Sequence, residues 1–249
     1  MVVEKFPEYG KRFGHDTFSR MLGEISELPE IKFPDIERVY SPKGNYLTYK
    51  KIKDPSDYER VAEIYRRSIS EMCGTECEWH HDPEKIEEMV KAGDWGFYGC
   101  YDKGEIIACE SMYINRGQRS MQWVWGAAHH DHLGRGVWAH IGEFNDELVA
   151  KSGALMGRVW VVTTHNKSQR TAERAGYIPM GIDFYWLGGP DGKWYYQPIL
   201  WYGKFYNVAL EHLSSSDLMR LTENSKQLKE IVKRFEEQKP IEEIIIPYF

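Results

Sequence analysis

The sequence lacks both a basic excess and a long apolar run. Its 32 Lys and Arg are outnumbered by 38 Asp and Glu, which gives a net charge of −6, and the basic residues form no cluster. Nucleic acid is therefore not an expected partner, because such proteins concentrate positive charge. No stretch approaches the roughly 20 apolar residues of a membrane span, and residues 1–18 show no apolar signal core. We expect a cytoplasmic protein that does not bind membranes.

Cysteine is also scarce, with four residues in a chain of 249. This number does not make a disulfide framework in a chain of this length. Cys100 and Cys109 fall in apolar, strand-like runs, where reduced thiols serve as small core residues. Low-complexity segments and internal repeats are absent, and hydrophobic residues reach 42% with 14% aromatic. The composition is that of a globular protein with a hydrophobic core, and the cysteine usage indicates a reducing compartment.

Three segments follow from the pattern along the chain: an N-terminal extension (1–44), a core domain (45–205) and a C-terminal helical extension with a tail (206–249). Period-two patterns and turn signals predict strands, and period-3.6 patterns with caps predict helices. The expected strands are 45–52, 95–102, 105–114, 120–128, 158–165, 177–187 and 195–205, and the expected helices are 16–28, 54–72, 82–93, 137–153, 167–176 and 225–238. A meander followed by alternating strands and helices indicates a mixed α/β (α+β) domain with a mostly antiparallel sheet.

One short segment has the makings of an anion site. Residues 128–138 read AHHDHLGRGVW, between the third meander strand and an expected helix. Gly134 and Gly136 allow tight backbone turns, and we expect the amides of residues 134–138 to open the helix and to bind a pyrophosphate. On their own, two glycines at a strand-to-helix junction are weak evidence for a phosphate-binding site.

The context strengthens this interpretation. The segment resembles the signature loop of the GNAT superfamily of acyl-CoA-dependent N-acyltransferases, with Asp131, Gly134, Arg135 and Gly136 at positions where that family commonly has these residues. Leu133 stands where the family usually has Arg or Gln, and Trp138 where it prefers Gly or Ala.

A second segment, THNKSQRTAERAGYIPMG (164–181), is similar to the family's later motif and resembles its branch that acetylates protein N-terminal amines. The matching positions are Ser168, Arg170, Glu173, Arg174, Gly176 and Tyr177. His165 stands at the position of the family's Asn, with Asn166 next to it, so either could contact the pantetheine arm. Ala172 replaces a tyrosine that donates a proton in other branches. The resemblance covers roughly residues 46–205 and leaves the ends unexplained.

The resemblance implies a GNAT-like fold and acetyl-CoA, or another acyl-CoA, as co-substrate. The cofactor-binding positions it implies are Val124, Trp125, Gly126, Leu133, Gly134, Arg135, Gly136, Val137, Trp138, His165, Asn166, Ser168 and Arg170. The pyrophosphate would lie on the loop amides, and the thioester carbonyl would bind a strand amide near Val124 or Trp125, where two parallel strands splay. An amine would then attack the thioester directly.

The sequence does not identify the general base or the general acid unambiguously. Glu110 is the first candidate for the base, with Glu76 and Glu78 as alternatives; the competing interpretation makes Glu110 a solvated residue on the polar face of a strand. Ser168, Tyr113 or Tyr202 could supply or order the proton for the leaving thiolate.

Metal sites are the rival interpretation. His129, His130 and His132 flank Asp131, but neighbours on an extended chain point to opposite sides, so we expect no metal there. Cys73, Cys77, His80 and His81 could supply four zinc ligands, yet their spacing is unusual, and they are better read as helix-end, core and loop residues.

Three functions remain: the N-acyltransferase, a non-catalytic acyl-CoA-binding or partner-binding module on the same fold, and a zinc protein. The acceptor of the transferase would be a small-molecule amine or a protein or peptide amine, and the chain is compatible with a homodimer. The aromatic run 183–205 is expected to form the core of a hairpin, with a pocket role open for some rings.

Overall fold

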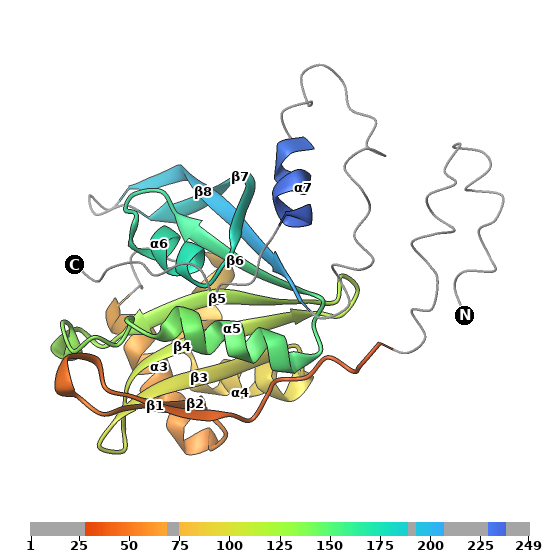
Figure 1. The fold of residues 1–249 in the computed structure, drawn as a ribbon. Helices are drawn as coiled ribbons and strands as arrows, with labels where there is room; N and C mark the ends of the chain where they lie inside the picture. Colours follow the sequence, from red (N-terminus) through yellow and green to blue (C-terminus); the bar gives the residue numbers. More distant parts are fainter. Residues whose placement is uncertain (1–27, 69–74, 189–192, 207–228, 238–249) are drawn as a thin grey trace.

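A single eight-stranded sheet organises the protein (Figure 1). The computed structural model describes residues 28–68, 75–188, 193–206 and 229–237. The strands are β1 (Glu37–Tyr40), β2 (Leu47–Lys51), β3 (Trp95–Asp102), β4 (Glu105–Asn115), β5 (Ser120–Ala128), β6 (Met156–Val162), β7 (Ile178–Gly188) and β8 (Trp194–Phe205). Their order is β1-β2-β3-β4-β5-β6-β8-β7, and every neighbouring pair is antiparallel except β5 with β6. The expected mixed, mostly antiparallel sheet is confirmed.

Helices cover both faces of this sheet (Figure 1). On one face, α3 (Tyr58–Ser68) and α4 (Pro83–Ala92) pack over an apolar cluster that includes Phe97 and Cys109. On the other, α5 (Ile141–Ser152) and α6 (Lys167–Arg174) pack over a larger cluster that includes Cys100. Both cysteines are buried free thiols, as expected. None of the described helices is long and apolar enough to span a membrane.

The described parts of the segments outside residues 45–205 pack onto the same sheet. In residues 28–44, β1 pairs with β2 at one edge of the sheet, and the side chain of Ile31 is buried in the larger cluster. At the other end, α7 (Lys229–Glu236) places the buried ring of Phe235 5.0 Å from the ring of Phe205. The helix expected over 16–28 lies outside the described residues, apart from residue 28.

Two expectations from the sequence are wrong. The helix expected over 137–153 begins at Ile141, so residues 134–138 form a loop before it and do not open it. The aromatic run is not a buried hairpin core: Ile182, Phe184, Trp186 and Tyr196 are 50–71% exposed on one face of the β7–β8 hairpin. Large apolar side chains in such numbers on a strand pair are uncommon on a surface without a partner.

The strands β5 and β6 part in the middle of the sheet. Their parallel pairing joins residues 120–123 to 156–159 and stops there. On its other side β5 carries a bulge, because Glu110 pairs with Gly126 and Met112 with Trp123, so that two β5 residues oppose Ser111. The bulge turns β5 away from β6, and Gly126 is exposed in the middle of a strand whose other residues are buried or half-buried. We call this gap the notch; it is the splay that the sequence predicts.

A substitution of Gly157 on β6 would test the packing beside the notch. A Cβ there would collide with the hydroxyl of Tyr177 and lie 2.9 Å from the ring of Tyr206, two residues that hydrogen bond to each other. Gly157→Ala should therefore destabilise the fold by about 1–3 kcal/mol, the usual cost of overpacking a core. Gly181→Ala on β7, where nothing lies within 4 Å of the added Cβ, is the matched control. Chemical denaturation of both variants decides, and equal stability would contradict this packing.

Candidate functional site

The glycine loop lies between a short 3-10 turn (His130–His132) and α5. Gly134 and Gly136 both have a φ of 83°, the left-handed conformation that favours glycine. Internal turn bonds occupy the amides of Leu133, Arg135 and Ala139. Within the described residues, the N–H groups of Gly134, Gly136, Val137 and Trp138 donate to no protein group. Consecutive free amides around left-handed glycines form an anion-binding concavity.

Residues from the β1–β2 region hold this loop in place. Lys43 Nζ donates to the carbonyl of Gly134 at 3.1 Å, Asn45 Nδ2 to that of Arg135 at 3.4 Å, and the Tyr49 hydroxyl to that of Val137. Pro42 packs so closely that a Cβ at Gly136 would lie 2.8 Å from it. No local sequence signal predicts these contacts, because they join positions about 90 residues apart.

The side chains that flank the loop differ in their environments. Arg135 pairs with Asp102 at the end of β3, so its charge is partly neutralised. Leu133 is 67% exposed and forms no part of the core. Trp138 is 37% exposed, and its ring would lie 3.1 Å from a Cβ at Gly126. The indole therefore packs beside the backbone of Gly126 on β5, where a larger residue would require the ring to shift.

The bulge on β5 is fixed from the α3 side. The Trp125 carbonyl accepts from the Tyr65 hydroxyl at 2.7 Å, and the Trp125 amide donates to Ser111 Oγ at 3.2 Å. Ser111 in turn lies 3.1 Å from Nε2 of the fully buried His80. The Trp125 amide is thus engaged, which leaves Val124 as the candidate of the two for a thioester carbonyl.

Glu110 is buried on the opposite side of the sheet, toward α5. Its Oε1 accepts from Asn145 Nδ2 at 2.5 Å, and burial, only partly offset by this bond, raises its pKa to about 8. Both side chains are at most 6% exposed, so the solvated interpretation is wrong. Asn145 Oδ1 has no donor among the described residues. A protonated Glu110 would supply that donor and close a two-bond acid–amide pair.

The Glu110 carboxyl nevertheless lies close to the notch, on the α5 side of the sheet. Its Oε2 would lie 4.0 Å from a Cβ at Gly126, the exposed glycine beside the Trp138 ring. The alternative bases are less suited, because Glu78 is exposed in the turn after α3 and the side chain of Glu76 lies outside the described residues. Glu110 is therefore the one candidate carboxyl that the described structure brings to the notch.

The second motif follows the C-terminal end of β6. His165 and Asn166 are exposed in the turn before α6, and Arg170 is exposed on the helix. Ser168 is half-buried, and its Oγ has no hydrogen-bond partner among the described residues. Of the other candidate acids, Tyr202 donates its hydroxyl proton to Glu173 at 2.9 Å, and the Tyr113 ring packs 5.0 Å from the ring of Trp95.

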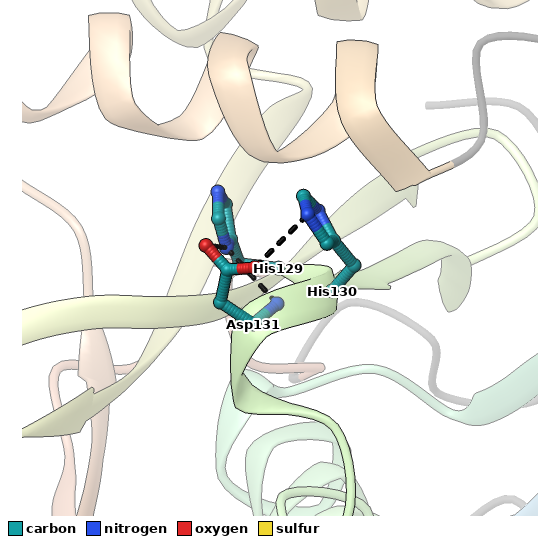
Figure 2. A group of neighbouring side chains, drawn as sticks. All are labelled: His129, His130 and Asp131. Carbon is teal, nitrogen blue, oxygen red and sulfur yellow. Dashed lines mark hydrogen bonds and ion pairs between the residues drawn. The ribbon is translucent and has the colours of Figure 1, made fainter.

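Three metal-binding side chains meet after β5, contrary to the expectation that neighbours diverge. The 3-10 turn gathers His129, His130 and Asp131 so that their ligand atoms lie within 4.8 Å of one another (Figure 2). Burial lowers the pKa of His129 and favours a neutral ring, and Arg67 Nη1 lies 3.3 Å from its Nε2. A permanent cation beside the ring opposes a divalent ion, so we assign no metal here.

The second rival site is only partly described. His80 is bonded to Ser111 and stacks on Trp79, with the two rings 3.8 Å apart. Cys73 and the side chain of Cys77 lie outside the described residues. Of the two histidines, His80 is therefore already engaged in the core, whereas Nε2 of His81 is buried and has no hydrogen-bond partner among the described residues.

Comparisons with known proteins support the fold. No family model and no curated protein matches the sequence. The structure resembles the ribosomal-protein-S5-alanine acetyltransferase of Vibrio fischeri, with a TM-score of 0.54, 14% identity, and coverage of 69% of this chain and 97% of that chain. It also resembles a protein of Salmonella typhimurium described as a putative acetyltransferase and solved with acetyl-CoA, with a TM-score of 0.51, 14% identity, and coverage of 64% of this chain and 93% of that chain.

This chain has the GNAT fold. A spermidine N-acetyltransferase chimera from Vibrio cholerae gives a TM-score of 0.50 at 15% identity and covers 68% of this chain and 98% of its own. At these identities the likeness establishes the architecture. In the GNAT arrangement the glycine loop follows the strand that bounds the notch, which is where this structure has it.

The buried Glu110 makes a pH-dependent contribution to stability. Its pKa is about 8 in the folded protein against a usual value of 4.5, so between these values the folded chain keeps a proton that the unfolded chain releases. The free energy of unfolding from this group therefore falls as pH rises from about 5 to 8. Glu110→Gln, which cannot ionise, should gain stability relative to the natural protein over this range. Urea denaturation at several pH values, with the exposed Glu78→Gln as control, measures the difference; parallel curves would contradict it.

Proposed function

We propose that this protein is an acyl-CoA-dependent N-acyltransferase that transfers an acetyl or other short acyl group to a primary amine. One observation carries the proposal: four backbone amides in the loop 134–138, which donate to no protein group among the described residues, lie next to the notch of a GNAT-fold sheet. Free amides of this kind bind phosphate oxygens, and a strand gap offers unpaired backbone to an amide-bearing arm.

Acetyl-CoA, or another short acyl-CoA, is the proposed co-substrate. Its pyrophosphate would be held by the loop amides, with Leu133 and Arg135 at the rim. Its pantetheine arm would lie in the notch against Val124–Gly126, and the second motif would form the opposite wall. The residues proposed for that wall are His165, Asn166, Ser168 and Arg170.

In the proposed reaction the neutral amine attacks the thioester carbon, and the carbonyl oxygen of the tetrahedral intermediate is stabilised by a strand amide, for which we propose that of Val124. Glu110 in its ionised form removes a proton from the amine through a water molecule at Gly126. Ser168, whose Oγ has no partner, donates a proton to the departing CoA thiolate. The C–S bond breaks, the C–N bond forms, and the products are the amide and free CoA.

The acceptor class is open between small amines and protein or peptide amines. The similar structures include a spermidine N-acetyltransferase and a ribosomal-protein alanine acetyltransferase. We keep both classes as candidates, with a homodimer as the proposed assembly, and expect neither nucleic acid nor a membrane to be a partner. A non-catalytic module on the same fold would bind CoA without releasing thiol from acetyl-CoA.

Gly134 allows a test of the pyrophosphate site. A Cβ at this position meets nothing within 4 Å, whereas at Gly136 it would meet Pro42. Gly134→Asp places a negative charge beside the pyrophosphate and should weaken CoA binding about tenfold or more. Gly134→Asn has nearly the same shape and backbone cost without the charge, and should bind CoA more tightly than the Asp variant. Isothermal titration measures both, and equal affinities would remove the loop as the anion site.

The general base sets the pH dependence of turnover. Because the pKa of Glu110 is raised to about 8 by burial, the ionised form becomes abundant only in mildly alkaline solution. At a fixed concentration of the neutral amine, thiol release from acetyl-CoA under kcat/KM conditions should therefore rise with pH and level off above about 8. Glu110→Gln should lower the rate by a factor of roughly 100 or more while CoA affinity stays unchanged. Retained turnover in the variant would exclude Glu110 as the base.

A further inference from the structure

A buried polar cluster lies against the bulge of β5 on the α3 side of the sheet. Ser111 of β4 is at its centre, and this side chain is fully buried. The Trp125 amide donates to Ser111 Oγ at 3.2 Å, and the Ser111 hydroxyl donates to the Trp125 carbonyl at 3.5 Å. The same carbonyl accepts from the Tyr65 hydroxyl at 2.7 Å. Side chains therefore bind both backbone groups of Trp125.

His80 completes this cluster from outside the two strands. It belongs to a 3-10 turn (Thr75–His81), is fully buried, and places its Nε2 3.1 Å from Ser111 Oγ. Ring contacts hold the imidazole in this position, because it stacks on Trp79 at 3.8 Å and lies 4.8 Å from the ring of Tyr65. The proposed reaction gives no role to His80 or to Ser111.

One assignment of protons satisfies every group in the cluster. The Ser111 oxygen can accept two hydrogen bonds and donate one. With its proton on Nε2, His80 donates to this oxygen, the Trp125 amide donates as well, and the Ser111 proton is directed to the Trp125 carbonyl. In the other tautomer the Ser111 proton would turn to His80 and leave that carbonyl. His80 therefore decides whether Ser111 holds one backbone group of Trp125 or both.

The peptide units carry this orientation to the other side of β5. In a trans peptide the N–H and the C=O point in opposite directions. The Trp125 N–H points to Ser111 on β4, so the Val124 carbonyl of the same peptide points away from β4. For the same reason the Gly126 N–H points away from the partners of the Trp125 carbonyl. Because β5 lies between β4 and β6, and its pairing with β6 stops at Trp123, both groups face the notch.

A carbonyl and an N–H on the same edge of a strand match an extended chain that contains amides. The pantetheine arm of CoA is such a chain. The Val124 carbonyl would accept from an N–H of the arm, and the Gly126 N–H would donate to one of its carbonyls, as in the pairing of two strands. Backbone groups that have left a ladder need partners of this kind.

We propose that His80 is a positioning residue for the co-substrate. Through Ser111 it fixes the Trp125 backbone, so that the Val124 carbonyl and the Gly126 N–H are turned into the notch, where they bind the amides of the pantetheine arm. This inference rests on the proposed binding of acyl-CoA at the notch.

The experiment separates the arm from the nucleotide part of CoA. Isothermal titration measures the affinity for CoA and for 3′-phosphoadenosine 5′-diphosphate, which carries the pyrophosphate without the arm. Ser111→Ala should weaken CoA binding about tenfold, the effect of one or two lost hydrogen bonds, and leave binding of the arm-free nucleotide unchanged. This substitution removes only one oxygen from the core, and urea denaturation checks that the variant is folded.

His80 offers a matched pair of variants. His80→Gln keeps an N–H donor near the position of Nε2, whereas His80→Met has a similar size and no donor. His80→Met should weaken CoA binding about fivefold, and His80→Gln should keep most of the affinity. Because His80 acts through Ser111, the double variant of His80→Met with Ser111→Ala should bind CoA no more weakly than Ser111→Ala alone.

Unchanged CoA affinity in Ser111→Ala and His80→Met would overturn the inference. An equal loss for the arm-free nucleotide would also overturn it, because the substitutions would then disturb the glycine loop. Equal affinities in His80→Gln and His80→Met would leave His80 with a packing role alone and overturn its assignment. If the natural protein binds CoA but releases no thiol from acetyl-CoA, the proposed transfer fails, and these titrations still decide the inference. If it binds no CoA, both fail together.

Discussion

The parting of β5 from β6 is the constraint on which the site depends. Backbone groups that leave a ladder need other partners, and here the bulge opposite Ser111 gives Trp125 its partners from side chains. Tyr65 comes from α3, and His80 comes from the turn that follows it, so the α3 layer holds the notch open. The free loop amides and the exposed Gly126 are useful only because this gap exists beside them.

Because Glu110 is buried, its protonation state affects both the stability of the fold and the proposed reaction. An ionised carboxylate in this core would leave Asn145 Oδ1 without a donor, whereas the neutral acid satisfies both partners. The environment that stabilises the fold with Glu110 protonated also suppresses the base form near neutral pH. The Trp138 ring lies beside Gly126, the point where water would reach the carboxyl. Access to the base therefore depends on how Trp138 is placed when the notch is filled.

The sequence predicted the local elements well and the long-range contacts poorly. The meander is recognisable because apolar residues alternate between short turns such as Asp102–Gly104, and those signals are local. The start of α5 was misread because Val137 and Ile141 have helical spacing, while the left-handed Gly136 and the turn that follows it delay the helix. Lys43, Asn45 and Tyr49 could not be linked to the loop, since only the tertiary fold brings them there. Glu110 was identified, but its burial was not, because strand periodicity does not show that α5 covers it.

Alternation along β6 separates the two faces of the sheet beside the notch. Val159 and Val161 close the core beneath α5 and α6, the side on which the glycine loop leads into α5. Trp160, between them, faces the α3 side, with its ring 4.6 Å from the ring of Trp201. A co-substrate anchored on the loop would thus lie on the α5 side, the side on which Glu110 pairs with Asn145. Direct transfer then requires the amine to reach the thioester carbon within proton-transfer reach of Glu110 and without displacing the CoA arm.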